Sequence, residues 1–481
     1  MKTFKKNDAF FPGKIKEKIV FALMVGAGIF LFYSFIYSDI LITSRHGINL
    51  WECLFTGNIG NFYEYNSVAK VESYAFYMEL GAFYDFPVYI IFAIWNIPMY
   101  VVEKNSDINL FQSLPCLMYM KTILIVFSIG TLTAMRKIAQ LCGVTRERLF
   151  LLSIMFLTSV LYVSSVVIIS QYDIIAICFM MWGLFFYMQK KMKLFHIFFA
   201  VAVPIKFFAF FMYIGLILYK EKNLLKDLFY IVIPFLPIGF FRVCIPFFEM
   251  SNDEVGFRHL FSNGIPVSTG SAVPLFIIFL VMFYAVCYIR QWQGNQEKAF
   301  YRETIETGFW IYTIIFGCSK AFPYWIMYWL PFLLLVLLLG KAELFKVNLL
   351  LEMICSISYI LVHTAGSGGL YGARVAGDML FARMLHSFGR VSVYKDMFNL
   401  YGTFEEHVSE KLTMDFFINI FTGVWIGSLL LFLFFNFVRK ENNIELETET
   451  SAKIYIYMHI ATGYILGGVP IVWYIVSMFP G

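Results

Sequence analysis

The sequence predicts an all-α protein that crosses a membrane many times. Hydrophobic residues make up 60% of its 481 residues, whereas charged residues make up only 14%. A soluble domain carries roughly a quarter charged residues, so this chain has too little charge to cover a soluble surface. Aromatic residues reach 20%, with 56 Phe and 30 Tyr. The composition therefore excludes a soluble enzyme and a disordered chain, and it favours a polytopic membrane protein.

Cysteine usage and charge distribution exclude other classes of protein. The chain has 8 cysteines, most of them inside apolar runs, and no CxxC pair occurs. We expect them to be small buried hydrophobic residues, with no disulfide framework and no zinc site. The net charge is +5, but no block of like charge is long enough to predict nucleic-acid binding.

The apolar runs give the order of the predicted spans. The first run, 19–37, follows a lysine-rich stretch and predicts an uncleaved anchor with a cytoplasmic N-terminus. With a weaker run at 86–102, we expect about 11–13 transmembrane helices. The later runs are 114–134, 149–169, 173–189, 194–219, 228–247, 272–290, 304–319, 323–340, 347–363, 414–438 and 454–476.

The weaker run decides the orientation of the chain. It is about 17 residues long, at the lower limit for a span, and it contains Pro87, Asn96 and Pro98. If 86–102 only dips into the outer interface, the basic loop 135–148 falls on the cytoplasmic side. The positive-inside rule prefers that arrangement, so we expect interfacial helices here.

The run 194–219 has lysines at both ends and Pro204 near its middle. A single crossing would leave one lysine cluster outside, against the positive-inside rule. We therefore expect a re-entrant helical hairpin that turns near Pro204 and returns to the cytoplasm. Each arm is too short to cross a bilayer core of ~30 Å.

These choices divide the chain into three parts. Residues 1–18 form a cytoplasmic N-terminus, 19–340 a first transmembrane module, and 341–481 a second, variable one. Two external segments are too short for independent domains and too long for simple turns: 38–113, which holds the interfacial helices, and 365–413.

Polar residues at the outer boundary are the first candidates for chemistry. Asp39 follows the first span directly, where a carboxylate can act as a general base on a hydroxyl at the lipid surface. Gln171, Tyr172 and Asp173 occupy a short external turn, and Gln171 and Asp173 are expected to face Asp39 across a cavity. The alternative is that Asp173 only caps the next helix.

Basic residues in unusual places suggest an anionic ligand. Lys206 lies among apolar residues in the predicted hairpin, which is costly unless it faces water or a counter-ion. A phosphate group fits this position, and snorkelling to the interface is the alternative. Arg374, Arg383 and His386 lie in the external segment 365–413, where either lipid head groups or a phosphate would explain them.

Aromatic side chains accompany these charges. Tyr84 and Asp85 lie at the start of the interfacial dip, and Tyr324 and Trp325 open a later span. An interfacial aromatic belt explains such residues. Sugar rings also stack on Tyr and Trp, so both interpretations stay open.

Taken together, these motifs resemble the GT-C glycosyltransferases, polytopic enzymes that use polyprenyl-phosphate sugars. The resemblance covers roughly residues 18–340 in order. The family's usual Gly before the Gln is Ser170 here, and its His-Pro pair is Phe322-Pro323. The matching motifs are Asp39, Phe86-Pro87-Val88-Tyr89, Gln171-Tyr172-Asp173, Pro204 with Lys206, and Pro323-Tyr324 with Pro331-Phe332.

The resemblance implies a GT-C-like helical bundle and an inverting sugar transfer at the outer membrane face. Asp39 would be the base, and Asp85 and Asp173 would orient the acceptor or stabilise charge. Lys206, Arg374 and Arg383 would neutralise the leaving phosphate. Gln171, Tyr172, Tyr84, Tyr324 and Trp325 would contact the substrates. The resemblance also leaves room for a divalent cation, Mg²⁺ or Mn²⁺, at Asp173.

The expected partners are a polyprenyl-phosphate sugar donor, a glycan or lipid acceptor of the cell envelope, and membrane lipids. The frequent Lys, Ile, Phe and Asn indicate a bacterial plasma membrane. Two other functions remain open. A lipid-linked glycan polymerase or ligase would centre on Arg374, Arg383 and His386. A flippase or transporter would carry ionisable residues along several mid-membrane helices.

Overall fold

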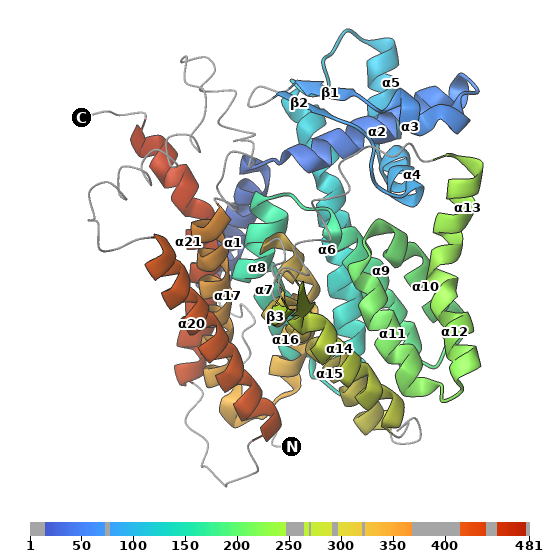
Figure 1. Ribbon diagram of the computed structural model, residues 1–481. Coiled ribbons are helices and arrows are strands. Elements are labelled where there is room, and N and C mark those ends of the chain that lie inside the picture. Colours follow the sequence, from blue (N-terminus) through green and yellow to red (C-terminus); the bar gives the residue numbers. More distant parts are fainter. Residues whose placement is uncertain are drawn as a thin grey trace. The chain divides into compact units, whose positions relative to one another are not determined.

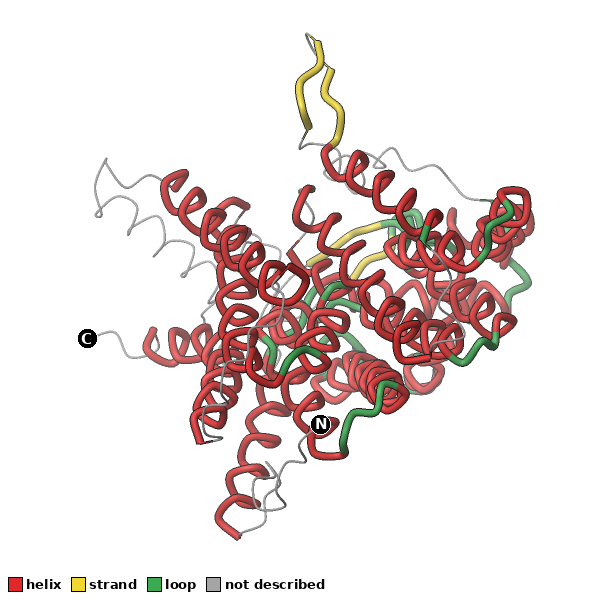
Figure 2. The backbone as a smooth tube through the Cα atoms, turned by 90° about the horizontal axis from the view of Figure 1, so that it is seen from below, coloured by secondary structure: helices red, strands yellow, loops and turns green. Residues whose placement is uncertain are grey.

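A computed structural model describes residues 15–72, 77–246, 264–268, 271–290, 297–319, 323–367, 414–438 and 450–477. Helices account for most of this backbone, and Figure 2 shows strands confined to two small hairpins. One hairpin pairs β1 (Ala69–Glu72) with β2 (Tyr77–Leu80), and the other pairs β3 (Gly264–Ser268) with β4 (Ser271–Pro274). The prediction of a helical membrane protein is confirmed, while the hairpins were not predicted.

The chain forms two compact units that interleave along the sequence. Unit 1 comprises Met1–Ile36, Ala139–Ile169 and Leu333–Gly481, and unit 2 comprises Tyr37–Ile138 and Ser170–Phe332. The sequence pattern predicted consecutive modules, 19–340 and 341–481. In the structure, the segment between Ala139 and Ile169 instead joins the C-terminal helices.

Unit 2 holds the elements that carry most of the predicted site residues. Figure 1 labels its α-helices. Its helical elements are α2 (Ser38–Phe55), η1 (Ile59–Asn61), α3 (Phe62–Tyr65), α4 (Phe86–Trp95), α5 (Ile97–Asn105), α6 (Leu114–Leu141, which runs on past the unit boundary), α9 (Asp173–Met188), α10 (Met192–Ile205), α11 (Phe208–Lys220), α12 (Leu224–Val232), η3 (Ile233–Phe235), α13 (Leu236–Cys244), α14 (Leu275–Ile289), α15 (Glu297–Cys318) and η5 (Pro323–Tyr328).

Unit 1 is a second set of helices. Its elements are α1 (Ile15–Ser34), α7 (Arg146–Thr158), α8 (Val160–Tyr162), the π-helix η2 (Val163–Ile168), α16 (Leu330–Leu339, which begins in unit 2), η6 (Ala342–Leu344), α17 (Phe345–Ser367), α20 (Met414–Leu433), the π-helix η7 (Phe434–Val438) and α21 (Thr450–Ser477). Asn348 on α17 and Asn436 on η7 exchange side-chain hydrogen bonds of 2.8 and 2.9 Å. Such amide pairs join helices where water is absent.

Four described helices are long and apolar enough to cross a membrane: Leu114–Leu141, Leu224–Cys244, Phe345–Val362 and Phe416–Phe437. Two bent pairs raise this number to six if each pair is one span. Among the helices that the structure describes, the number long and apolar enough to cross a bilayer does not reach the expected total of about 11–13. Several of the apolar runs form helices of only 10–17 residues.

The bent pairs mark places where an apolar run does not form one straight helix. The predicted interfacial run is α4 followed by α5, with a bend of 64°. The bend lies at Asn96–Ile97, just before Pro98, where proline disfavours a continuous helix. The second pair, α7 with α8 and η2, bends by 43° at Ser159.

The run 194–219 forms a helical hairpin. Helix α10 contains Pro204 in its last turn, Lys206 is extended with φ −156° and ψ 123°, and α11 begins at Phe208. Tyr187 near the end of α9 donates to the Leu216 carbonyl of α11 at 2.9 Å. The ends of α9 and α11 therefore lie together, and the hairpin turn returns to the beginning of α9 (Figure 1).

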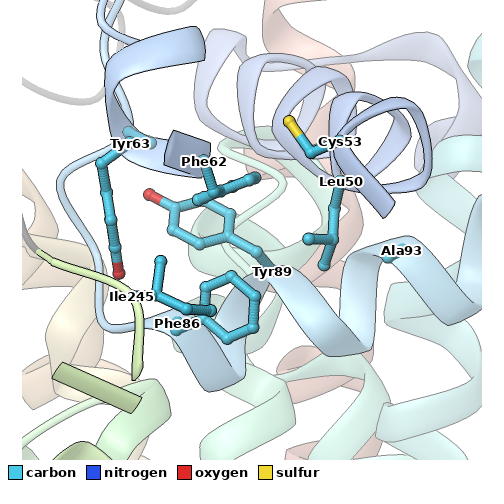
Figure 3. Packing of buried hydrophobic residues seen from close by; sticks show 9 residues of the cluster. Leu50, Cys53, Phe62, Tyr63, Phe86, Tyr89, Ala93 and Ile245 are labelled. Carbon is cyan, nitrogen blue, oxygen red and sulfur yellow. The ribbon is translucent and has the colours of Figure 1, made fainter. Parts of the chain in front are cut away.

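A buried aromatic cluster fixes α2 against α4. Phe62 of α3 lies with its ring centroid 5.3 Å from Phe86 and 5.0 Å from Tyr89 of α4, and Figure 3 shows these rings in one cluster with Leu50 and Cys53 of α2. At Gly47 an added Cβ would lie 2.7 Å from the Phe92 backbone. Glycine thus permits the close approach of α2 to α4, and this packing positions both Asp39 and the loop that carries Tyr84.

Candidate functional site

The centre of the site is Asp39, in the first turn of α2. Gln171 Nε2 donates a hydrogen bond to Asp39 Oδ2 at 3.0 Å, and Thr43 Oγ1 donates to the Asp39 carbonyl at 2.6 Å. The unpaired N–H groups at a helix N-terminus stabilise a carboxylate by about 0.3–1 kcal/mol. Asp39 is half-buried, so its carboxylate is held in place and is still partly exposed.

Gln171 lies in a turn whose backbone is strained. Ser170 has φ 54°, in the left-handed region that side chains other than glycine seldom occupy. Such a conformation costs of order 1–3 kcal/mol and persists only where the surrounding structure enforces it. Both residues are buried, with Gln171 2% exposed. Ser170 stands where the resemblance leads one to expect glycine, and the backbone adopts the glycine-type conformation there.

The next polar pair is Asp173 with Lys206. Lys206 Nζ lies 3.3 Å from Asp173 Oδ1, with the two side chains 14% and 1% exposed. Asp173 opens α9 and Lys206 occupies the hairpin turn, so the counter-ion that a lysine among apolar residues requires is supplied by α9. Asp173 Oδ2 has no hydrogen-bond partner among the residues that the structure describes.

Three aromatic rings surround the Lys206 ammonium. Its nitrogen lies 5.4 Å from the Tyr84 centroid, 5.8 Å from that of Tyr172 and 5.5 Å from that of Trp325. Ammonium groups within about 6 Å of a ring are attracted to its face. Tyr84 and Tyr172 also meet edge to face, with centroids 5.6 Å apart. The cation is therefore held by one carboxylate and an aromatic cage.

Tyr84, a member of this cage, also lies within electrostatic reach of Asp39. Its backbone carbonyl accepts from Tyr63 Oη at 2.9 Å, and its backbone N–H donates to Tyr89 Oη at 2.9 Å. Burial raises the pKa of the Tyr84 hydroxyl well above its ordinary value, and the nearby Asp39 carboxylate raises it further. Tyr84 therefore stays protonated and keeps a hydrogen to donate in the neighbourhood of Asp39.

Asp85 has a different partner, Arg242. Arg242 on α13 donates to Asp85 Oδ1 from Nε at 3.2 Å and from Nη2 at 3.1 Å. Burial raises the pKa of Asp85 above its ordinary value, and the Arg242 charge opposes this rise. Sequence reasoning did not single out Arg242, although a lone arginine in an apolar run signals a counter-ion.

The remaining aromatic residues come from η5. Trp325 packs on Phe208 with centroids 4.8 Å apart, and Tyr324 meets Trp325 edge to face at 6.0 Å. Tyr324 lies within electrostatic reach of Asp39 and Asp173. Tyr328, which sequence reasoning missed, lies near Asp173 and is fully buried. The predicted residues Tyr84, Tyr172, Tyr324 and Trp325 thus gather around the two carboxylates.

The described residues do not fit a divalent cation at Asp173. The Lys206 ammonium already lies beside this carboxylate, and no three His, Cys, Asp or Glu side chains form a ligand cluster in the described part of the chain. Arg374, Arg383 and His386 lie outside the described residues.

Comparison of the chain with protein-family models, with curated proteins and with solved structures gives no match.

Proposed function

We propose that the protein is a GT-C-type glycosyltransferase. It moves a sugar from a polyprenyl-phosphate-linked donor to a glycan or lipid acceptor of the cell envelope, at the outer face of a bacterial plasma membrane. The observation that carries the proposal is the contact between Gln171 and Asp39 beside the caged Lys206–Asp173 pair. A fixed carboxylate and a fixed cation within one aromatic-lined site suit a hydroxyl nucleophile and an anionic leaving group.

In the proposed reaction Asp39 takes the proton of the acceptor hydroxyl. The acceptor oxygen forms a bond to the anomeric carbon, while the bond from that carbon to the phosphate oxygen breaks. The electron pair of the broken bond leaves with polyprenyl phosphate, and a single displacement inverts the configuration. Gln171 orients the base through its hydrogen bond to Oδ2.

Lys206 is proposed to stabilise the negative charge that develops on the leaving phosphate. Asp173 and the three rings act as positioning residues, since they hold the Lys206 ammonium in place at the turn of the hairpin. Asp85 also becomes a positioning residue in this scheme, because its ion pair with Arg242 holds α13 to the start of α4.

A flippase or transporter is the second candidate, and one observation favours it. Unit 1 contains a buried contact between two ionisable side chains, with His459 Nε2 3.1 Å from Glu352 Oε2, inside apolar helices. Ionisable residues in such a place are typical of transport pathways. Catalysis remains the first proposal because the larger set of fixed polar groups lies in unit 2.

A reconstituted assay separates the two functions. The purified protein is placed in liposomes with radiolabelled polyprenyl-phosphate sugars and an envelope lipid extract as acceptor. The transferase predicts a labelled product and an equal amount of released polyprenyl phosphate. Movement of intact donor between leaflets, with no release of polyprenyl phosphate from any donor, would contradict it and support the flippase.

A further inference from the structure

A second polar cluster lies entirely within unit 1. It joins α17, α21 and the break between α7 and α8. Its members are almost fully buried, with Glu352 1%, His459 2% and Ser159 0% exposed. A buried carboxylate and imidazole among apolar helices are costly unless their charges and hydrogen bonds are balanced. The contacts of the cluster indicate which of its atoms carry protons.

The helix break supplies one side of the cluster. Helix α7 ends at Thr158, and Ser159 leaves the helical conformation with φ −59° and ψ 138°. Ser159 Oγ accepts from the Leu161 N–H at 3.3 Å and donates to Glu352 Oε1 at 3.2 Å. Helix α21 meets this break directly, because a Cβ added at Gly463 would lie 2.0 Å from the Thr158 carbonyl oxygen.

Glu352 uses its two oxygens differently. Oε1 accepts from Ser159 Oγ and, at 3.0 Å, from Ser356 Oγ one turn along α17. Oε2 faces His459 Nε2 at 3.1 Å. Because two hydroxyl hydrogens already point at Oε1, any proton that the carboxyl group carries belongs on Oε2, toward the imidazole.

Thr158 fixes the tautomer of His459. The Thr158 hydroxyl donates its one hydrogen to the Ile154 carbonyl at 2.9 Å. His459 Nδ1 lies 3.2 Å from the same hydroxyl oxygen, which can therefore only accept from it. Because a hydroxyl has a single donor, both contacts are hydrogen bonds only when Nδ1 carries the hydrogen. A neutral imidazole with hydrogen on Nδ1 has a bare lone pair on Nε2, and that lone pair faces Glu352 Oε2.

We propose that Glu352 and His459 bind one proton between Oε2 and Nε2. The two lone pairs would otherwise oppose each other at hydrogen-bond distance. With one proton the pair has no net charge, whichever atom holds the proton. A second proton or none would leave an unbalanced charge in an apolar interior, which is expensive. The proton is thus the ligand of this site, and it ties α21 to α17 and to the break in α7.

The proposal predicts an asymmetry between two substitutions. In Glu352→Gln an amide hydrogen replaces the bound proton: the amide N–H donates to His459 Nε2, and the amide oxygen accepts from both serines. In His459→Phe a buried carboxylate loses the partner that shares its proton. We expect Glu352→Gln to keep the melting temperature near that of wild type, and His459→Phe to lower it by roughly 5–15 °C.

The double variant provides the decisive comparison, with Glu343→Gln on an exposed part of unit 1 as the matched control. Adding Glu352→Gln to His459→Phe removes the stranded carboxylate, so the double variant should melt well above His459→Phe alone. A double variant that melts no higher, or a Glu352→Gln protein that melts as low as His459→Phe, would overturn the proposal.

Nitrogen-15 NMR of histidine-labelled wild-type protein tests the same point without relying on folding of the His459→Phe variant. The chain has 7 histidines, and the His459 signal is the one that responds to Glu352→Gln. We expect Nδ1 to be protonated in wild type and in Glu352→Gln. A bare Nδ1 in either protein would show that the inferred tautomer, and with it the shared proton, is wrong.

Discussion

Gln171 Nε2 lies 3.0 Å from Asp39 Oδ2, although the two residues are 132 positions apart in the chain. The contact joins the first turn of α2 to the turn that precedes α9. Neither residue is placed by flexible chain: Asp39 is held by the packing of α2 on α4, and Gln171 by the left-handed Ser170 before it.

Substitution Gln171→Ala should slow sugar transfer without unfolding the protein. A hydrogen bond to a charged group contributes about 1.5–3 kcal/mol, so loss of orientation at Asp39 should lower kcat roughly 10- to 100-fold. The check is the initial rate of labelled product formation in reconstituted protein. Gln140→Ala changes an exposed glutamine on α6 and serves as the control. Equal rates for the two variants would remove Gln171 from the site.

Lys206→Met should destabilise the protein strongly. The substitution leaves the Asp173 carboxylate, only 1% exposed, without its cation. Removing one partner of a buried ion pair costs about 3–5 kcal/mol. Thermal unfolding of purified protein should show a large drop, and adding Asp173→Asn should recover part of it. The exposed Lys226→Met is the control; if both lysine variants melt alike, the buried ion pair is not important for stability.

His46 should make the protein less stable in mild acid. It is 1% exposed, its Nε2 lies 3.1 Å from the Leu80 carbonyl, and its Nδ1 has no partner in the described chain. Burial lowers the pKa of His46 from 6.5 to about 4; the Leu80 carbonyl opposes this change, and the Arg45 charge adds to it. The imidazole is therefore neutral in the folded protein at pH 7.

The direction in which stability changes with pH follows from the lowered pKa of His46. Above pH 6.5 both folded and unfolded states hold neutral His46, so its stabilising effect is complete. As the pH falls from 6.5 toward 4, the unfolded state takes up the proton first, and up to about 3 kcal/mol is lost. The stability difference between wild type and His46→Gln, measured by denaturation across this range, should shift in favour of the variant. A difference that does not change with pH would contradict the prediction.

Two glycines on α21 should respond oppositely to alanine. At Gly463 a Cβ would lie 2.0 Å from the Thr158 carbonyl oxygen, whereas at Gly468 nothing lies within 4 Å. Alanine stabilises an open helical position by about 0.5–1 kcal/mol. Gly468→Ala should therefore raise the melting temperature and Gly463→Ala should lower it, since backbone atoms cannot move aside cheaply. Equal shifts for the two variants would mean that α21 does not contact the α7 break closely.

Composition and apolar runs were sufficient to predict a helical membrane protein, because burial in lipid requires long apolar helices. They were less able to predict where a run breaks. Ser159 interrupts a run that reads as continuous from 149 to 169, and its hydroxyl is satisfied by Glu352, far away in the chain. Such a break depends on a tertiary partner that local sequence does not reveal.

The candidate site shows the same division. Asp39, Gln171 and Lys206 could be singled out because polar residues in a membrane are costly and mark functional sites. Their partners could not: the pairing of Lys206 with Asp173 follows from the return of the hairpin to the start of α9, and that of Asp85 with Arg242 from the packing of α13. Glu352 carried a usable signal, a lone acid within the apolar run 347–363, which sequence reasoning passed over.

The most direct test of the proposed function is the transfer rate of Asp39→Asn, with Asp107→Asn, an exposed acid of the same segment 38–113, as the matched control. Asparagine preserves the size of the side chain and can still bond to Gln171, but it cannot accept the acceptor's proton. General-base catalysis contributes about 10²–10⁴-fold. We predict that Asp39→Asn loses at least this much product formation while its melting temperature stays near that of wild type, and that Asp107→Asn transfers normally. Undiminished transfer by a folded Asp39→Asn protein would contradict the mechanism.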